Sequence, residues 1–302
     1  MYIRFGYEIG IECPQPTPMM TYLSPAADTR GRILQEKGPV STPVVAMEET
    51  SDVFGNTCLR LVAPKGAFSL VYDALVRDEA PAMPRAHGAA VSVEALPMGC
   101  MPFVTASRYC ETDRFGTLAW KLFGDVPAGR ARVEAICDYV RERLVFSYGY
   151  STGLRTAMEA HVDRVGVCRD YAHLAVTLCR AMNMPARYVN GFVADTAADP
   201  QPAPMDFHAW FEVYLASGWH TFDAFRPDIA TGRIAVARGR DAADIPLIQT
   251  FGSHELTTFK IWTRRESEGR LGRPHEDADV SLVSPWFSTR WARHLHERER
   301  GR

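Results

Sequence analysis

Three side chains have the types and the setting of a thiol catalytic site, and Cys168 is the first of them. It follows Gly166-Val167 and begins a predicted helix whose apolar face carries Leu174, Ala175, Leu178 and Cys179. Backbone N–H groups at a helix N-terminus have no intrahelical partner and the helix dipole is positive there, which favours a thiolate over a thiol. The sequence therefore predicts an activated nucleophile at Cys168, with neighbouring N–H groups that can hold an oxyanion.

A base and an acid follow the cysteine along the chain. His208 lies in the strand-like run DFHAWFEVYL, and Asp223 lies in WHTFDAF after a short Ser217-Gly218 turn, a pattern typical of a β-hairpin. Hairpin pairing is expected to bring the two side chains together. A carboxylate beside an imidazole fixes its tautomer and stabilises the imidazolium that forms when the ring takes the thiol proton. We therefore predict Cys168 as nucleophile, His208 as base and Asp223 as the orienting acid.

The elements that must position these residues change character along the chain. Near the N-terminus, Ile3, Phe5, Tyr7, Ile9 and Ile11 alternate with polar residues and glycines, which predicts a half-buried strand with one face in water. STPVVAMEET, GNTCLRLVAP and FSLVYDALVRD are further short β-type runs, which favours an antiparallel sandwich or barrel. Later, Val133, Ile136, Cys137, Val140 and Leu144 form one stripe of a helix.

The stretch between these two regions, from Ala80 to Pro102, is rich in proline and is typical of a connector. We predict an N-terminal β-rich domain over 1–102, a catalytic core over 103–263 and a charged C-terminal tail over 264–302. The length of 302 residues agrees with two domains, at roughly 150 residues per domain.

Composition excludes several classes of protein. The 46% hydrophobic and 23% charged residues are typical of a globular fold, and the formal charge of −2 argues against a nucleic-acid binder. No apolar stretch reaches the roughly 18 residues of a membrane span. Glu8 and Glu12 lie where a signal peptide would be apolar, and the seven cysteines form no C-x-x-C pair, so we expect reduced thiols in the cytoplasm.

The segments around the three side chains resemble a known family. GVCRDYAHLAVTLCRAMNMPARYVNGF, DFHAWFEVYL and WHTFDAFRP are similar to the three motifs of the bacterial transglutaminase-like superfamily, often described as cysteine proteases. The resemblance runs from about Ser107 to about Thr263. It implies an α+β fold with a papain-like/transglutaminase-like core preceded by an N-terminal antiparallel β-sandwich. It also implies the order Cys, His, Asp, carried here by Cys168, His208 and Asp223. One departure is DAFR, where many relatives have a small residue after Asp-Ala or Asp-Pro.

Other interpretations of these residues are weaker. Gly149-Tyr150-Ser151-Thr152-Gly153 matches a G-x-S-x-G nucleophile elbow, but an α/β-hydrolase needs parallel strands before it. Cys168, His208 and Asp223 could instead ligate zinc, although such sites usually have more than one histidine or paired thiolates. Tyr171 and His173 are expected to pack or cap. Trp210, Phe211, Trp219 and Phe222 are expected to be core aromatics, one of which could line the cleft. No motif for a nucleotide, phosphate or calcium cofactor occurs.

The predicted function is a cysteine-dependent amide or acyl hydrolase, a protease or amidase, that forms a thioester acyl-enzyme on Cys168. The first alternative is a transglutaminase, which transfers the same acyl group to an amine. The second is a non-catalytic binding scaffold. The expected partner is a peptide or protein with an amide bond, with no cofactor, metal, nucleic acid or membrane. The sequence predicts neither the substrate's identity nor the oligomeric state.

Overall fold

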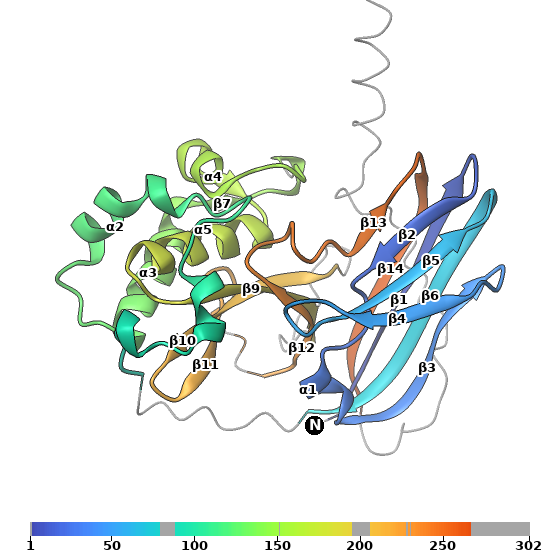
Figure 1. The fold of residues 1–302 in the computed structure, drawn as a ribbon, viewed down its shortest axis with the longest axis horizontal. Helices are drawn as coiled ribbons and strands as arrows, with labels where there is room; N and C mark the ends of the chain where they lie inside the picture. The colour runs from blue at the N-terminus through green and yellow to red at the C-terminus, as the bar shows by residue number, and fades with distance from the viewer. Residues whose placement is uncertain are drawn as a thin grey trace, which may run out of the picture.

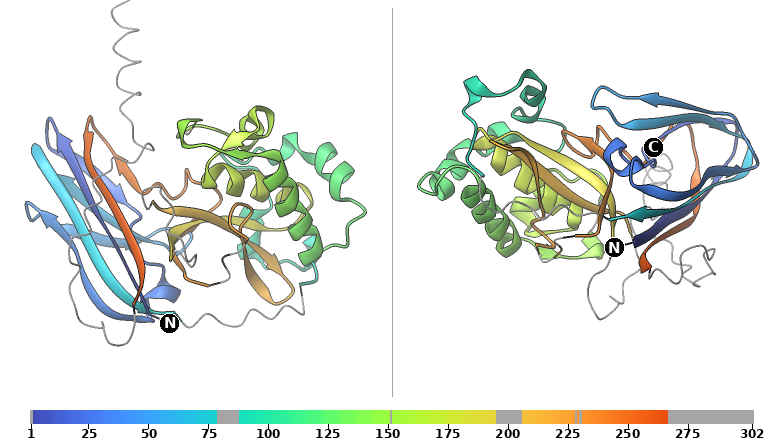
Figure 2. Two further views of the ribbon diagram at one scale, coloured as in Figure 1. Left: turned by 180° about the vertical axis from the view of Figure 1, so that it is seen from behind. Right: turned by 90° about the horizontal axis from the view of Figure 1, so that it is seen from below.

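The computed structural model describes residues 2–78, 88–150, 152–194, 206–227, 229 and 231–266. In Figure 1 a sandwich of antiparallel strands lies beside a core of helices on a smaller sheet, and Figure 2 shows the same arrangement from behind and from below. The predicted α+β fold, with antiparallel strands before the helical core, is confirmed. None of the helices in the described ranges is long and apolar enough to cross a lipid bilayer.

Two four-stranded antiparallel sheets make the sandwich, in the orders β14-β1-β6-β3 and β13-β2-β5-β4. Alternate side chains of both sheets point inward and form one apolar cluster. A one-turn helix, α1, lies between β2 and β3. The bounds are β1 Tyr2–Cys13, β2 Thr17–Thr21, α1 Ala27–Arg30, β3 Ile33–Thr42, β4 Met47–Ser51, β5 Thr57–Ala63, β6 Gly66–Arg77, β13 Ile248–Thr250 and β14 Glu255–Glu266.

The inward face of β1 carries the predicted apolar residues, but its second face is covered as well. Arg4 is 8% exposed and pairs with Asp73 of β6, and the indole of Trp262 from β14 lies over Gly6. A Cβ at Gly6 would lie 2.5 Å from that indole, so glycine is required there. The expectation of a water-facing side for this strand is therefore wrong at these positions, because side chains of the neighbouring strands β6 and β14 cover that face.

The sandwich includes strands from the C-terminal part of the described chain. β14 pairs antiparallel with β1 from Tyr2↔Glu266 onward, and β13 pairs with β2. The predicted core range of 103–263 is therefore too long at its C-terminal end, because Phe259 and Ile261 of β14 pack into the sandwich. Residues 267–302, which make up most of the predicted charged tail, lie outside the described residues.

The core is a third four-stranded antiparallel sheet, in the order β11-β10-β9-β12, with helix α5 packed on one face. Helices α2, α3 and α4 pack around α5 and enclose an apolar cluster, which contains the whole predicted stripe from Val133 to Leu144. The main bounds are α2 Gly116–Phe123, α3 Arg130–Arg143, α4 Ala157–Asp163, α5 Cys168–Ala181, β9 Ala186–Val193, β10 His208–Leu215, β11 Gly218–Phe222 and β12 Arg233–Gly239.

Short elements complete the core. β7, Val145–Phe146, and β8, Val165–Gly166, form a small parallel pair just before α5. The described residues also form short 3₁₀ helices: η1 Val93–Ala95, η2 Met98–Phe103, η3 Thr112–Arg114 and η4 Tyr148–Tyr150. The first two occupy the described end of the predicted connector, and residues 79–87 of that connector lie outside the described residues.

Candidate active site

Helix α5 begins at Cys168, as the sequence predicts. The residue before it, Val167, has extended backbone geometry, and its N–H donates to the Asp170 carboxylate at 2.9 Å. This contact fixes the chain as it enters the helix. A Cβ at Gly166 would lie 2.6 Å from the Asp170 Cβ, so glycine leaves the room that this carboxylate needs. Cys168 is 8% exposed, and the helix behind it is buried.

The hairpin of β10 and β11 brings His208 and Asp223 together, as predicted. The strands pair antiparallel from Phe211↔Phe222 to Leu215↔Gly218. Asp223 directly follows β11, and its Oδ2 lies 2.7 Å from Nε2 of His208, which begins β10. The other carboxylate oxygen accepts the backbone N–H groups of Phe225 at 2.9 Å and Arg226 at 2.8 Å. The carboxylate is therefore held on both of its oxygens.

Cys168 and His208 line one cavity of about 350 Å³, and Cys168 is close enough to His208 to contribute to raising the pKa of the ring. Since Nε2 is bound to Asp223, Nδ1 is the ring nitrogen left for the sulfur. The structure thus brings all three predicted residues together in the order sulfur, ring, carboxylate.

The electrostatics of this cluster favour a charged ring beside an ionised acid. Burial alone would lower the pKa of His208, but the hydrogen bond and charge of Asp223, and then those of Cys168, raise it to about 9. Burial opposes ionisation of Asp223 too, yet His208 and Arg233 hold the pKa of this carboxyl well below its usual value. At neutral pH the pair is therefore an imidazolium on a carboxylate.

Two contacts of the His208–Asp223 pair were not predicted from the sequence. The guanidinium of Arg233, the first residue of β12, donates to Asp223 Oδ2 at 3.0 Å. The ring of Phe225, which lies in the DAFR departure, is centred 6.2 Å from the His208 ring and stacks on Phe146 at 4.4 Å. Neither residue belongs to a recognisable spacing pattern, because both reach the site through loops whose paths the sequence does not specify.

The cavity beside Cys168 lies between the core and the sandwich. One side is formed by the segment 242–249, which follows β12, and another by Phe259 of β14. The remaining lining residues come from α5, β9 and β10 and the segments around them: Tyr109, Gly153, Cys168, Arg169, Tyr188, Asn190, Asp206, Phe207, His208 and Ala209. The sandwich therefore supplies part of the wall opposite the sulfur.

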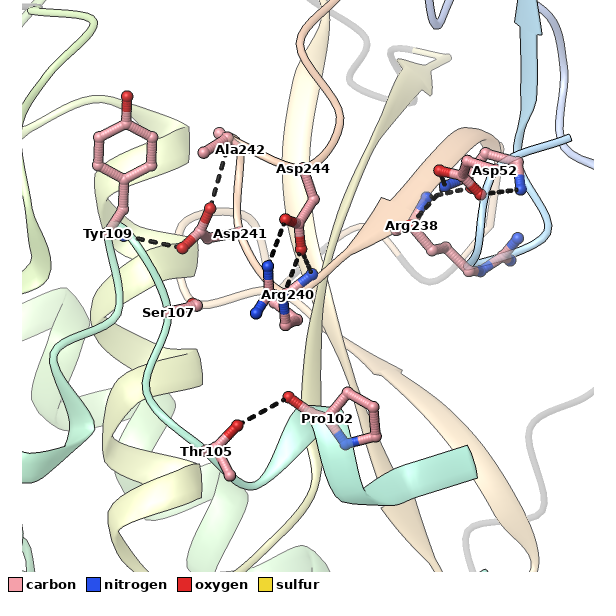
Figure 3. A network of polar contacts seen from close by, with 12 residues as sticks. Asp52, Pro102, Thr105, Ser107, Tyr109, Arg238, Arg240, Asp241, Ala242 and Asp244 are labelled. Atoms are coloured by element: carbon pink, nitrogen blue, oxygen red, sulfur yellow. Dashed lines mark hydrogen bonds and ion pairs between the residues drawn. The ribbon is translucent and has the colours of Figure 1, made fainter. Parts of the chain in front are cut away.

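The segment after β12 is held by several buried polar contacts, some of which are drawn in Figure 3. Asp241 accepts the Tyr109 N–H at 2.8 Å, and Asp244 binds the side chain of Arg240 at 2.9 Å. His173 of α5 is fully buried, and its Nε2 accepts the Ala242 N–H at 3.1 Å. His173 thus packs and fastens the cavity wall, in agreement with its predicted structural role.

A second cavity, of about 630 Å³, lies behind Asp223 and is lined by α1, α3 and the strands of the core sheet. Trp210, Trp219 and Phe222 line this cavity and not the one beside Cys168. Asp223 lies in the wall of the second cavity while His208 lies in the wall of the first. The pair therefore separates the two spaces.

Two of the weaker interpretations concern a serine and a metal. Ser151 of the G-x-S-x-G match lies outside the described residues. Across the described ranges, no group of three or more His, Cys, Asp or Glu side chains is arranged to hold a metal ion.

Comparisons with known proteins identify the family and the fold. The family model of the transglutaminase-like superfamily matches residues 117–224, a range that contains Cys168, His208 and Asp223. The crystal structure of a putative cysteine protease from Cytophaga hutchinsonii is 31% identical in sequence, with a TM-score of 0.75. The likeness covers 87% of this chain and 90% of that one, so it includes both the sandwich and the core.

Curated relatives match over a shorter range. An uncharacterised protein from Mycobacterium leprae is 31% identical over 136 residues, which is 44% of this chain and 48% of that protein. An uncharacterised protein from Mycobacterium bovis is 32% identical over 133 residues, which is 39% of this chain and 41% of that protein. The chain thus spans less than half the length of these two relatives.

Proposed function

Because the chain belongs to the transglutaminase-like superfamily, we propose that it is a cysteine-dependent hydrolase of amide bonds with Cys168, His208 and Asp223 as its catalytic triad. Membership and the likeness to a cysteine protease support a cysteine-dependent hydrolase or acyltransferase. The observation that carries the finer proposal is the 2.7 Å contact of His208 Nε2 with Asp223, which leaves the opposite side of the ring to Cys168.

In the first half-reaction the Cys168 sulfur attacks the carbonyl carbon of the substrate. The proton of the thiol is held by His208 Nδ1, and Asp223 stabilises the resulting imidazolium. Charge builds up on the carbonyl oxygen, where the backbone N–H of Cys168 at the start of α5 donates to it. The tetrahedral intermediate collapses when Nδ1 gives its proton to the leaving amine, the C–N bond breaks and a thioester remains on Cys168.

In the second half-reaction a water molecule attacks the thioester carbon. His208 takes the proton of this water and returns it to the sulfur, so that the carboxylic acid leaves and the enzyme is regenerated. A primary amine in place of water would give an isopeptide or secondary amide. Hydrolysis needs no second binding site for an acceptor, because water reaches the open cavity from solvent. We therefore assign hydrolysis as the reaction.

The test is incubation of the wild-type protein with a peptide library, with and without an added primary amine, followed by mass spectrometry. Cleavage, deamidation and incorporation of the amine change the peptide mass differently. We expect cleavage or deamidation that Cys168→Ala abolishes. Cys179→Ala is the matched control, because Cys179 lies in the same helix but is fully buried away from the cavity. Predominant incorporation of the amine would make the protein a transglutaminase instead.

A non-catalytic scaffold would turn over none of these peptides, and thiol reactivity then distinguishes it from an enzyme with an untested substrate. Burial raises the pKa of five other cysteines, which disfavours their thiolates: Cys58, Cys100, Cys110, Cys137 and Cys179. At pH 6 to 7 we expect iodoacetamide to modify Cys168 first, and more slowly in His208→Ala. Equal rates at all seven cysteines would support the scaffold.

A further inference from the structure

Asp223 Oδ2 accepts hydrogen bonds from two cationic side chains. His208 Nε2 lies 2.7 Å from this oxygen, and the Arg233 guanidinium lies 3.0 Å from it on the side of the second cavity. The side chains of Asp223 and Arg233 are only 2% and 13% exposed, so water screens these charges weakly. Sulfur, ring, carboxylate and guanidinium therefore form a row of alternating charge when Cys168 is a thiolate.

Arg233 is fastened independently of the triad. Its guanidinium donates to the carbonyl oxygens of Arg226, at 3.0 Å, and Ile229, both in the segment that follows Asp223. The preceding residue, Gly232, has a φ of +85° and donates its N–H to Asp78 at 3.0 Å. Asp78 directly follows β6 of the sandwich, so the turn that carries Arg233 is tied to the sandwich.

Other ionisable groups also surround the His208 ring and belong in any account of its titration. They come from the start of α5, from the segment before β10, from β9 and from η4. The α5 residues lie beside Nδ1, and a carboxylate and two phenols lie around the cavity or close to the sulfur: Cys168, Arg169, Asp206, Tyr188 and Tyr148. Of the two charged side chains that hydrogen-bond to Asp223 Oδ2, Arg233 carries the same positive charge as the imidazolium and repels it.

We propose that Arg233 is a positioning residue that shares Asp223 Oδ2 with His208, fixing the direction of the carboxylate while weakening its hold on the imidazolium. This inference rests on the proposed triad and goes beyond it. A buried carboxylate facing one cation would stabilise the imidazolium so strongly that the ring would be a poor proton donor. A second cation on the same oxygen competes for that charge, so His208 can still release its proton to the leaving amine.

The titration of the His208 ring tests the charge competition without any substrate. The experiment uses NMR of histidine-labelled protein in a Cys168→Ala background, so that the thiol does not titrate with the ring. The His208 signal is assigned by its loss in His208→Gln among the nine histidines. In Arg233→Met we expect the midpoint of His208 to rise by about one pH unit, because a cation close to the ring has been removed.

Two further variants keep this test interpretable. Arg233→Lys retains the charge and is expected to reverse most of the shift. Arg233→Gln retains a donor without the charge, so it should raise the His208 midpoint as Arg233→Met does. It takes the place of Arg233→Met in the test if the methionine variant does not fold. Arg141→Met is the matched control, because Arg141 lines the same cavity but pairs with Asp138. An unchanged or lowered midpoint in folded Arg233→Met, or an equal rise in Arg141→Met, would overturn the proposal.

Kinetics on a cleaved peptide give a second readout. Arg233→Met in the wild-type background is expected to lower kcat about tenfold with little change in KM, and to move the alkaline limb of the pH profile upward. Arg233→Lys should restore most of kcat. A loss confined to KM would contradict the assigned role. If the wild type neither cleaves peptides nor shows selective alkylation of Cys168, the proposed function fails. The NMR titration still decides, independently of that outcome, whether Arg233 lowers the pKa of His208.

Discussion

At the scale of single residues, the buried pair of His208 and Asp223 links the chemistry of the site to the stability of the fold. The side chains of His208 and Asp223 are 15% and 2% exposed. The carboxylate that stabilises the imidazolium is itself held in place by two backbone N–H groups. In the unfolded chain the ring titrates at its ordinary pKa near 6.5. Folding thus increases proton binding at His208, and stability must depend on pH.

We predict the direction of that dependence in a Cys168→Ala background, where the neighbouring thiol no longer contributes. Because the pKa of His208 is raised by Asp223, the folded state binds more protons above pH 6.5, and its stabilisation is fully present below that pH. The unfolding free energy should therefore fall as the pH rises above 6.5 toward the raised pKa of the ring in the folded variant, with a slope of up to ~1.4 kcal/mol per pH unit.

Urea unfolding at a series of pH values measures this slope. The same series with His208→Gln added gives the background from all other groups, and the difference between the two curves is the contribution of His208. A difference that is flat across this range, or that grows with pH, would mean that the carboxylate does not stabilise the charged ring.

The sequence predicted the three triad residues because each lies in a local pattern: a helix start, a strand and the strand after a tight turn. It did not predict Arg233 or Phe225. Their contacts with Asp223 and His208 depend on how the segment after β11 folds back, and no periodicity encodes that path. The residues of the proposed triad could thus be picked out from the sequence, whereas the residues that contact their charged and aromatic groups could not.

At the scale of elements, the entry into α5 sets the position of the sulfur. The Val167 N–H would be buried without a partner if Asp170 did not accept it, and the Asp170 side chain is only 1% exposed. A helix that began one residue later would move Cys168 away from the dipole and from His208. The start of this helix is therefore a structural requirement of the site.

Replacing Asp170 tests this requirement. Asp170→Ala leaves a buried donor unsatisfied and should lower the unfolding free energy by about 1–3 kcal/mol, measured by urea denaturation. It should also slow the alkylation of Cys168, because the first turn loosens. Asp170→Asn keeps an oxygen that accepts the Val167 N–H, so it should retain most of the stability. Equal losses in both variants would show that the carboxylate charge, and not the cap, matters.

Element types were largely predictable, and the surroundings of each element were not. The alternation in β1 correctly indicated a strand, and the stripe in α3 a helix, because each pattern reflects local geometry. The covering of the second face of β1 by Trp262 and Asp73 requires residues far along the chain. For the same reason the predicted core range of 103–263 included most of β14, although this strand completes the sandwich.

At the scale of the whole molecule, the sandwich is joined to the core through backbone as well as side-chain contacts. Asn56, in the turn between β4 and β5, donates to the Arg238 carbonyl at 2.7 Å and accepts the Arg238 N–H at 2.8 Å, beside the Asp52 contacts shown in Figure 3. Aromatic rings continue the joint, since Phe5 lies 5.0 Å from Phe192 between ring centres. The sandwich therefore supports the wall of the catalytic cavity.

Removing the amide of Asn56 should weaken this joint. Asn56 is 4% exposed, and Asn56→Ala removes the side chain that binds both the N–H and the carbonyl of Arg238. We expect a loss of about 2 kcal/mol or more in unfolding free energy, measured by urea denaturation. Asn56→Asp keeps the acceptor but sets a second carboxylate against Asp52, whose Oδ2 accepts the Asn56 amide at 2.8 Å, so its loss should be at least as large. A neutral Asn56→Ala would mean that water replaces these hydrogen bonds.

The pairing of β1 with β14 governs how the molecule can be assembled. Residue 2 lies opposite residue 266 in the same sheet, so one edge of β1 stays uncovered until β14, which is synthesised about 250 residues later, pairs with it. Closing so long a loop is slow, and during that time an unpaired twelve-residue edge is exposed to other chains. Expression of the first hundred residues alone would make that exposure permanent and should yield aggregates.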